Sequence, residues 1–266
     1  MNKAHALIMS GYGLNCEEET KFAFELAGGS ASIVHINDLI SQEKHLIDYN
    51  VLVFPGGFAY GDDTGSGNAF ANKVRNHLWD ELQTFLQRDT LILGICNGFQ
   101  ILVNLGLLPA VDKRYGDRQV ALLHNDSARY TVRWVDMACD SSSPFLQNID
   151  TLSLPIAHGE GKFFASEKML ASLIEHKQIA LRYVKGEICT FQSLPENPNG
   201  SLDNIAAITD ETGKVFGLMP HPERAIFFHQ LPHYTFLREK YKRDGREVPK
   251  YGPGLQIFQN AVNYFD

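Results

Sequence analysis

The 266-residue chain is predicted to form an α/β domain: a mostly parallel, doubly wound sheet with helices on both faces, plus a small antiparallel extension. Two observations support this fold class. Strand and helix patterns alternate up to residue 105, which is typical of βαβ units. After residue 118 the strand patterns become shorter and are joined by turns. We expect one domain, residues 1–266, with the second half packed on the first.

The elements of the first half follow from hydrophobic periodicity. The segment 49–54 is almost wholly apolar, as expected of a parallel strand covered on both faces. Gly11-x-Gly13 after the first strand has some likeness to a dinucleotide fingerprint, but Cys16 stands where its third glycine belongs, so an ordinary turn is favoured. Strands are expected over 4–9, 30–36, 49–54 and 91–93, and helices over 17–27, 68–88 and 99–103, the last ended by Gly106. In the second half, strands are expected over 120–123, 130–135, 151–155, 179–184 and 205–209.

Composition excludes several classes of function. Apolar residues make up 44% and charged residues 21% of the chain, as in ordinary globular proteins. A net charge of −7 argues against non-specific nucleic-acid binding. No apolar stretch has the length of a signal peptide or membrane span, so we expect a cytoplasmic protein with reduced cysteines. The four cysteines form no C-x-x-C pair, so we expect no metal site.

The segment Gly94-Ile95-Cys96-Asn97-Gly98 carries the strongest chemical signal. It follows a strand and precedes a helix, which is the pattern of a nucleophile elbow with sulfur as the nucleophile. Glycines on either side leave room for the tight turn, and the positive end of the helix dipole favours a thiolate. A buried, inert cysteine is the alternative, but such a cysteine needs no elbow. Cys96 is therefore predicted to be a nucleophile.

Two further segments supply the partners that a thiolate needs. Pro55-Gly56-Gly57 follows the strand 49–54, where its N–H groups form a candidate oxyanion hole. In Pro220-His221-Pro222-Glu223 the prolines keep the backbone extended, so His221 and Glu223 share one face. His221 is the candidate base and Glu223 the candidate carboxylate that orients it. A ligand-free turn and a solvated His–Glu loop are the respective alternatives.

These segments together resemble the triad-type (class I) glutamine amidotransferases, whose fold is flavodoxin-like. More narrowly, PGGFAYGD (55–62), AHGEGKF (157–163), NPNGS (197–201) and GLMPHPERA (217–225) resemble the glutaminase subunits of phosphoribosylformylglycinamidine synthases. The resemblance covers residues 4–225 and resumes over 257–265. The sequence departs from the pattern of that family at Ala59, residues 63–67 and Ala206-Ala207. None of these positions is Cys96, His221 or Glu223.

The resemblance implies a role for each site residue. Cys96 would attack the side-chain amide of glutamine and form a thioester, with His221 as base and Glu223 orienting it. N–H groups of Gly57 and Asn97 would stabilise the oxyanion. Gln100 and the segment 125–127 correspond to parts of the glutamine pocket. Residue types and spacing alone indicate only a cysteine hydrolase on an α/β sheet.

The resemblance also implies partners and no cofactor in this chain. Ammonia would pass to a synthetase subunit that binds ATP and Mg²⁺ and converts formylglycinamide ribonucleotide to formylglycinamidine ribonucleotide in purine biosynthesis. A small third subunit would bridge the two. Residues 226–253 form an insertion relative to short family members, aromatic and basic, and are expected to be either a docking segment for the synthetase or a solvated excursion.

Other functions stay open on the sequence. One is a different cysteine hydrolase of the same fold, such as a peptidase or the glutaminase of another synthetase. A non-catalytic scaffold subunit is a second, although an intact set of Cys96, His221 and Glu223 argues against it.

Overall fold

The predicted fold class is confirmed by a computed structural model that describes residues 3–266. One nine-stranded sheet forms the centre, in the order β2-β1-β3-β4-β11-β10-β9-β6-β7, and β5 and β8 form a separate two-stranded sheet. The strands are β1 (His5–Ser10), β2 (Ser30–His35), β3 (Val51–Phe54), β4 (Leu91–Ile95), β5 (Ala121–Leu123), β6 (Thr131–Cys139), β7 (Thr151–His158), β8 (Lys162–Phe164), β9 (Ile179–Val184), β10 (Ile205–Thr209) and β11 (Val215–Leu218).

The first five strands of the sheet order are parallel and bring the site together. β4 lies between β3 and β11, with Gly94 opposite Phe54 on one side and Gly217 on the other. Parallel neighbours end at the same edge of a sheet. The segments that follow β3, β4 and β11 therefore meet at one edge, although they are far apart in the sequence.

The antiparallel extension continues this same sheet through β10, β9, β6 and β7. The predicted packing of the second half on the first is thus achieved by strand pairing. β7 shows the alternating burial of a strand with one covered face, and its buried set ends with His158. The expected strands of this half are present, while β8, β11 and the helices α5 to α8 were not predicted.

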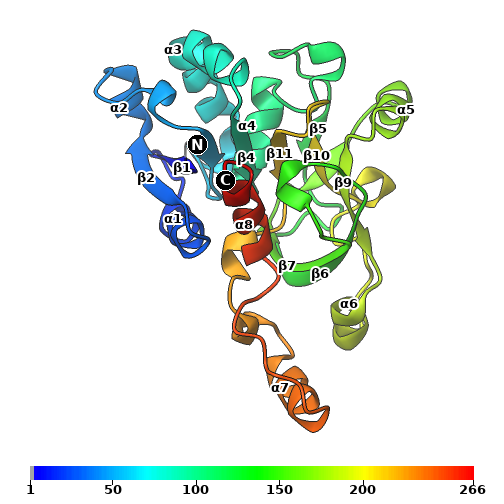
Figure 1. Ribbon diagram of the computed structural model, residues 1–266. Helices are drawn as coiled ribbons and strands as arrows, with labels where there is room; N and C mark the ends of the chain where they lie inside the picture. The colour runs from blue at the N-terminus through cyan, green and yellow to red at the C-terminus, as the bar shows by residue number, and fades with distance from the viewer. Residues whose placement is uncertain (1–2) are drawn as a thin grey trace.

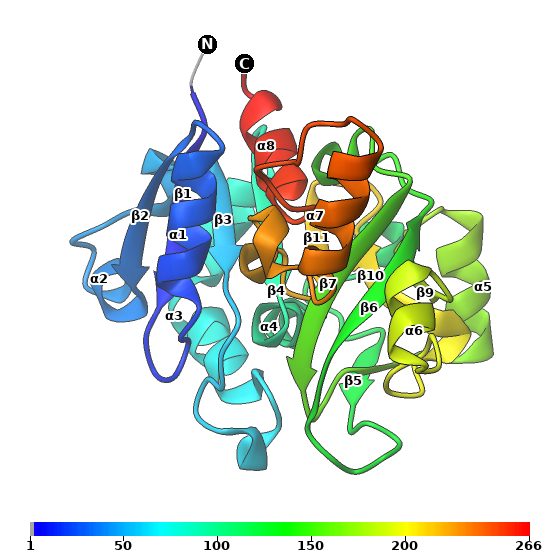
Figure 2. The ribbon, with the colours of Figure 1, turned by 90° about the horizontal axis from the view of Figure 1, so that it is seen from below.

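Helices cover both faces of the sheet, as Figures 1 and 2 show. In Figure 1, α3 and α4 lie above the parallel strands, while α1 and α8 lie below them and contact each other. Three glutamates in the first turn of α1 complement its dipole, and Gly106 ends α4 in the left-handed conformation, as predicted. The helices are α1 (Glu17–Leu26), α2 (Ile36–Ile40), α3 (Asn68–Leu86), α4 (Asn97–Leu105), α5 (Glu167–Glu175), α6 (Glu187–Gln192), α7 (Tyr234–Arg243) and α8 (Leu255–Asn263).

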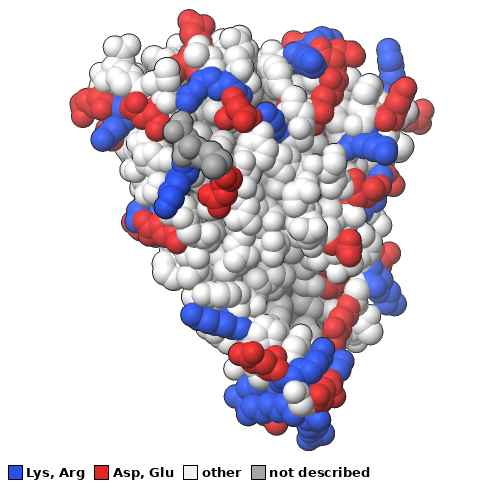
Figure 3. All heavy atoms as spheres, in the orientation of Figure 1, with Lys and Arg blue, Asp and Glu red and all other residues white. Residues whose placement is uncertain are grey.

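The insertion 226–253 forms an arm that projects from the body and carries α7 at its tip (Figure 1). A bridge between Phe227 and Tyr251 closes its base. Inside the arm, the ring of Phe228 packs edge-on against Tyr234 and Tyr241, at 5.8 and 5.5 Å between centroids. No residue of α7 is buried, and lysine and arginine side chains gather at this end of the molecule in Figure 3.

Within residues 3–266, no helix combines the length and the apolar character that crossing a bilayer requires.

Candidate active site

The turn that carries Cys96 has the strained geometry of a nucleophile elbow. Cys96 links β4 to α4 with a φ of 51°, a left-handed value that a residue with a side chain adopts only under constraint. Its N–H donates to the carbonyl of Leu218 at 2.8 Å, and its own carbonyl accepts from the N–H of Gln100. These bonds hold the turn between β11 and the first turn of α4.

The two flanking glycines are required because the backbone of α4 approaches the sheet closely. A Cβ on Gly98 would lie 1.8 Å from the carbonyl oxygen of Phe54, and one on Gly94 would lie 2.8 Å from the carbonyl oxygen of Gly98. No other residue fits either position without moving the backbone. This confirms the steric reason by which the sequence indicated an elbow.

His221 lies beside this turn and is fixed at both ends. Its N–H donates to the carbonyl of Pro155 in β7 at 2.8 Å. Its Nδ1 lies 2.5 Å from Oε1 of Glu223, which stands in the short 3-10 helix Pro222–Arg224. Both side chains are buried, and Nε2 of His221 has no hydrogen-bond partner among the residues that the structure describes. The structure thus joins the predicted pair, and one ring nitrogen is left free to move a proton.

Electrostatics favour the imidazolium form of His221. Burial disfavours its charge, but the negative charges of Glu223 and the Cys96 sulfur outweigh burial and raise the pKa of His221 well above its usual value. A protonated His221 beside Cys96 is placed to give a proton to a leaving group. The sulfur of Cys96 lies 3.7 Å from the carbonyl oxygen of Ala157.

The predicted oxyanion loop follows β3 and is held from both sides. Phe58 donates its N–H to Gly13 and Gly56 accepts from Asn15, so the loop pairs with the segment after β1. On its other side, the N–H of Ala59 donates to Oδ1 of Asn97 at 3.0 Å. Because Asn97 is the first residue of α4, its own N–H has no acceptor within the helix.

Gln100 and the segment 125–127 lie around the next loop, residues 158–162. Gln100 accepts from Asn97 and donates to the carbonyl of Glu160 at 2.6 Å. Asn125 is buried and its Oδ1 lies 3.1 Å from Nδ1 of His158. Both amide groups are thereby engaged within the protein, and their contribution to a glutamine pocket stays a prediction.

Three residues with contacts at the site were given no role by the sequence. Tyr130 donates its hydroxyl to Ala157 at 2.9 Å and lies with Phe58 at the exposed rim. Cys16 and Arg224 lie behind His221, with Nη2 of Arg224 donating to the Cys16 sulfur at 3.0 Å. Arg224 stands inside a motif that the resemblance highlighted, whereas nothing local marks Cys16, which lies about 200 residues away in the chain.

In the described part of the chain, Cys16, His221 and Glu223 are the one group of three side chains whose ligand-type atoms could hold a metal, all within 4.8 Å of one another. His221 and Glu223 are already hydrogen-bonded to each other, so a metal would have to displace that bond.

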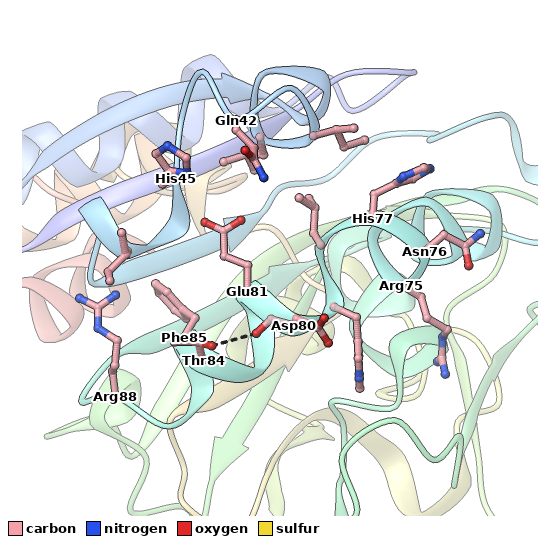
Figure 4. A pocket seen from close by; sticks show the side chains of 15 residues that line it. Gln42, His45, Arg75, Asn76, His77, Asp80, Glu81, Thr84, Phe85 and Arg88 are labelled. Atoms are coloured by element: carbon pink, nitrogen blue, oxygen red, sulfur yellow. Dashed lines mark hydrogen bonds between the residues drawn. The ribbon is translucent and has the colours of Figure 1, made fainter.

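A pocket of about 650 Å³ lies elsewhere, along the outer side of α3 (Figure 4). It is lined by Glu81 and His77 of α3, by Arg88 just after the end of α3, and by His45 of the facing loop. Arg75, at one end of this pocket, donates to the carbonyls of Asn104 and Leu105 and so caps α4. None of the lining residues belongs to the Cys96 site.

A doubly wound sheet, an elbow cysteine and a buried His–Glu pair define the class of triad-type glutamine amidotransferases. The sequence model of the CobB/CobQ-like glutamine amidotransferase domain matches residues 3–265. The chain belongs to this family and, within it, to the PurQ subunits of phosphoribosylformylglycinamidine synthase.

The similarity to individual relatives extends over the whole chain. The PurQ subunit of Methanococcus maripaludis is 50% identical, with 98% of this chain and 97% of the relative covered. That of Dehalococcoides mccartyi is 41% identical over 99% and 98% of the two chains. Among solved structures, PurLQS from Thermotoga maritima contains a chain with a TM-score of 0.72 and 30% identity, with both chains covered in full. The resemblance drawn from the sequence is thereby confirmed.

Proposed function

We propose that this chain hydrolyses glutamine to glutamate and ammonia, with Cys96 as nucleophile, His221 as acid and base, and Glu223 as the group that orients and charges His221. The observation that carries the proposal is the buried His221–Glu223 bond beside the strained Cys96 turn, with Nε2 of His221 left free. The steps below follow from this geometry.

In the first step the Cys96 thiolate attacks the side-chain amide carbon of glutamine and a C–S bond forms. The amide oxygen becomes an oxyanion, which the N–H groups of Gly57 and Asn97 would stabilise. The N–H of Phe58 points to Gly13, so the alternation of an extended chain directs the N–H of Gly57 to the opposite side of the loop. The N–H of Asn97 is free of an intrahelical acceptor.

In the second step the C–N bond breaks and Nε2 of His221 gives its proton to the leaving nitrogen, which departs as ammonia. Neutral His221 then takes a proton from water as the water attacks the glutamyl thioester. The C–S bond breaks, glutamate leaves and the Cys96–His221 ion pair returns. We propose that this half-reaction uses only the side chains of this protein and no cofactor.

We further propose that the ammonia passes to an ATP- and Mg²⁺-using synthetase subunit that converts formylglycinamide ribonucleotide to formylglycinamidine ribonucleotide, with a small third subunit bridging the two, in the cytoplasm. The full-length similarity to PurQ subunits and to a chain of PurLQS supports this assignment. The PurQ relatives are subunits of phosphoribosylformylglycinamidine synthase.

The arm 226–253 is our candidate for the surface that docks on the synthetase subunit. It carries exposed Phe236 together with the basic side chains of α7 and projects from the body, as a docking element would. Replacing residues 230–250 by a short linker across the Phe227–Tyr251 bridge should abolish complex formation and leave the site intact. Unchanged binding of the synthetase would contradict this role.

The function is tested by measuring glutamate release from glutamine by the purified chain, alone and with its synthetase partners, beside Cys96→Ala. We expect release that appears or rises with the partners and vanishes in the variant. Release that the variant retains, or cleavage of peptides in place of glutamine, would reject the assignment.

A further inference from the structure

Cys16 is buried directly behind the catalytic histidine, with 1% of its surface exposed. Its N–H donates to the carbonyl of Gly56 at 3.1 Å, which ties it to the oxyanion loop. A Cβ placed on Gly56 would lie 3.1 Å from the Cys16 sulfur and 2.8 Å from Cε1 of His221. The Cys16 sulfur, the His221 ring and the backbone of the oxyanion loop therefore meet at Gly56.

The guanidinium of Arg224 contacts a sulfur atom although a carboxylate lies next to it. Its Nη2 donates to the Cys16 sulfur at 3.0 Å, whereas its Nε stays 3.6 Å from Oε1 of Glu223. A guanidinium normally binds a carboxylate through two parallel hydrogen bonds of about 2.7–2.9 Å. Here the carboxylate is adjacent, yet the shorter contact is to the Cys16 sulfur.

One oxygen of the Glu223 carboxylate is available for such a pair with Arg224. Its Oε1 holds His221, but its Oε2 is buried and has no partner within the described residues. An unpaired buried carboxylate oxygen is unfavourable and would attract a neighbouring cation. Arg224 is that cation, and its contact with Cys16 is what holds it aside.

We propose that Cys16 is a positioning residue that retains Arg224 and so keeps the Glu223 carboxylate for His221. The proposal rests on the triad assignment made above. A full Arg224–Glu223 pair would offset the carboxylate charge, lower the pKa of His221 and leave less of it as the imidazolium that protonates the leaving nitrogen. The sulfur thus protects the charge state of the catalytic histidine without touching glutamine.

Several titratable groups face His221 from the elements packed around it. They are Cys96 of the elbow, Glu223 and Arg224 of the 3-10 helix, Cys16 before α1, His158 at the end of β7 and Tyr130 before β6. Replacing Cys16 by alanine removes its contact with Arg224 and also its own interaction with the His221 ring, and the double variant described below separates the two effects.

The test measures kcat/KM for glutamate release against pH in the complex with the synthetase partners. In Cys16→Ala we expect Arg224 to turn to Glu223, so that kcat/KM falls about tenfold at neutral pH. The alkaline limb, where the imidazolium is lost, should move to lower pH by about one unit because His221 loses part of its carboxylate charge. Cys16→Ser keeps an acceptor and should fall between the two.

The decisive variant is Cys16→Ala combined with Arg224→Ala. Removing the competing guanidinium should return most of the lost activity and restore the pH of the alkaline limb. If Cys16→Ala acted only through lost packing, the second substitution would not restore either quantity. A double variant as slow as Cys16→Ala, or a Cys16→Ala profile identical to the wild type, would overturn the proposal. Cys96→Ala in the same assay tests the triad separately, because abolished release there upholds the function whatever Cys16 does.

Discussion

Two buried histidines near the same sheet edge have opposite protonation behaviour. His221 is paired with Glu223, and its pKa is raised well above the usual value despite its burial. His158 is buried to the same degree, but Nδ1 faces the amide oxygen of Asn125. Burial, and the positive charge of His221 nearby, lower the pKa of His158 to about 3.

The difference shows that the partner, more than the depth of burial, decides what a buried histidine can do. A carboxylate supplies the charge that keeps His221 protonated, whereas an amide oxygen supplies only a hydrogen-bond acceptor. His158 is therefore a neutral structural residue that fixes Asn125, whose side chain also binds the N–H of Gly161. His221 is a proton carrier. Four measurements can break or sharpen this distinction.

The largest expected effect comes from exchanging each histidine for asparagine. His221→Asn removes the proton carrier, so we expect kcat for glutamate release to fall about 10³-fold. His158→Asn should reduce kcat by less than about tenfold, since the residue carries no proton in the reaction. The steady-state rates of both variants, with thermal unfolding to verify their folding, check this. Similar losses in kcat would break the comparison.

Glu223→Gln tests the partner itself. The amide keeps the shape but removes the charge, so we expect kcat to fall about 10²-fold and the alkaline limb of kcat/KM to move to lower pH. Glu25→Gln is the matched control, because Glu25 pairs with Lys21 at the surface, 45% exposed. A Glu223→Gln enzyme with an unshifted limb would show that the carboxylate does not set the charge of His221.

The dependence of the unfolding free energy on pH below neutrality tests the same difference between His158 and His221. Below about pH 6.5 the unfolded chain protonates His158 and the folded chain does not, so unfolding becomes easier as pH falls. Between pH 6.5 and 5 this amounts to about 2 kcal/mol of unfolding free energy. His221 has the opposite sign: its stabilisation is greatest below the unfolded pKa of about 6.5 and is lost as pH rises through its raised folded pKa.

Urea unfolding of the wild type and of His158→Asn at the two pH values isolates this contribution. The variant should lose about 2 kcal/mol less than the wild type on acidification. An equal loss in both proteins would mean that His158 is not held neutral.

The smallest expected effect belongs to a third histidine. His124 also lies beside a carboxylate, with Nδ1 3.2 Å from Oε1 of Glu160, but its side chain is 81% exposed. Exposed ion pairs contribute little, so His124→Gln should change the unfolding free energy by less than about 0.5 kcal/mol. A larger change in urea unfolding would show that exposure does not weaken such a pair here.

The parallel half of the fold and the elbow could be predicted because their determinants are local. The apolar run of β3, the glycines around Cys96 and the stop at Gly106 each express a steric or hydrophobic requirement of a few adjacent residues. The His221–Glu223 pair was also predicted from a short segment, but the extended backbone expected there was wrong: Pro222–Arg224 forms a 3-10 helix, in which Glu223 bonds to His221.

The surroundings of that pair could not be predicted from local pattern. Cys16 reaches His221 only because β1 and β3 lie side by side, and Oε2 of Glu223 is unpaired only because Arg224 binds elsewhere. The short β8 and the helices α5, α6 and α8 were missed because their boundaries depend on packing against the rest of the molecule, whereas α7 lies in the projecting arm and has no buried residue. The cap of α5 by Ser166 was a local signal that could have revealed that helix.

Nitrogen NMR of histidine side chains in the labelled protein tests the central claim most directly, because it reads the protonation of His221 and His158 in one titration. The account predicts that His221 stays doubly protonated through neutral pH and that His158 stays neutral, with its proton on Nδ1, down to about pH 4. In Glu223→Gln only the His221 signal should titrate at lower pH. Two histidines that both titrate near pH 6.5, in either protein, would contradict the account.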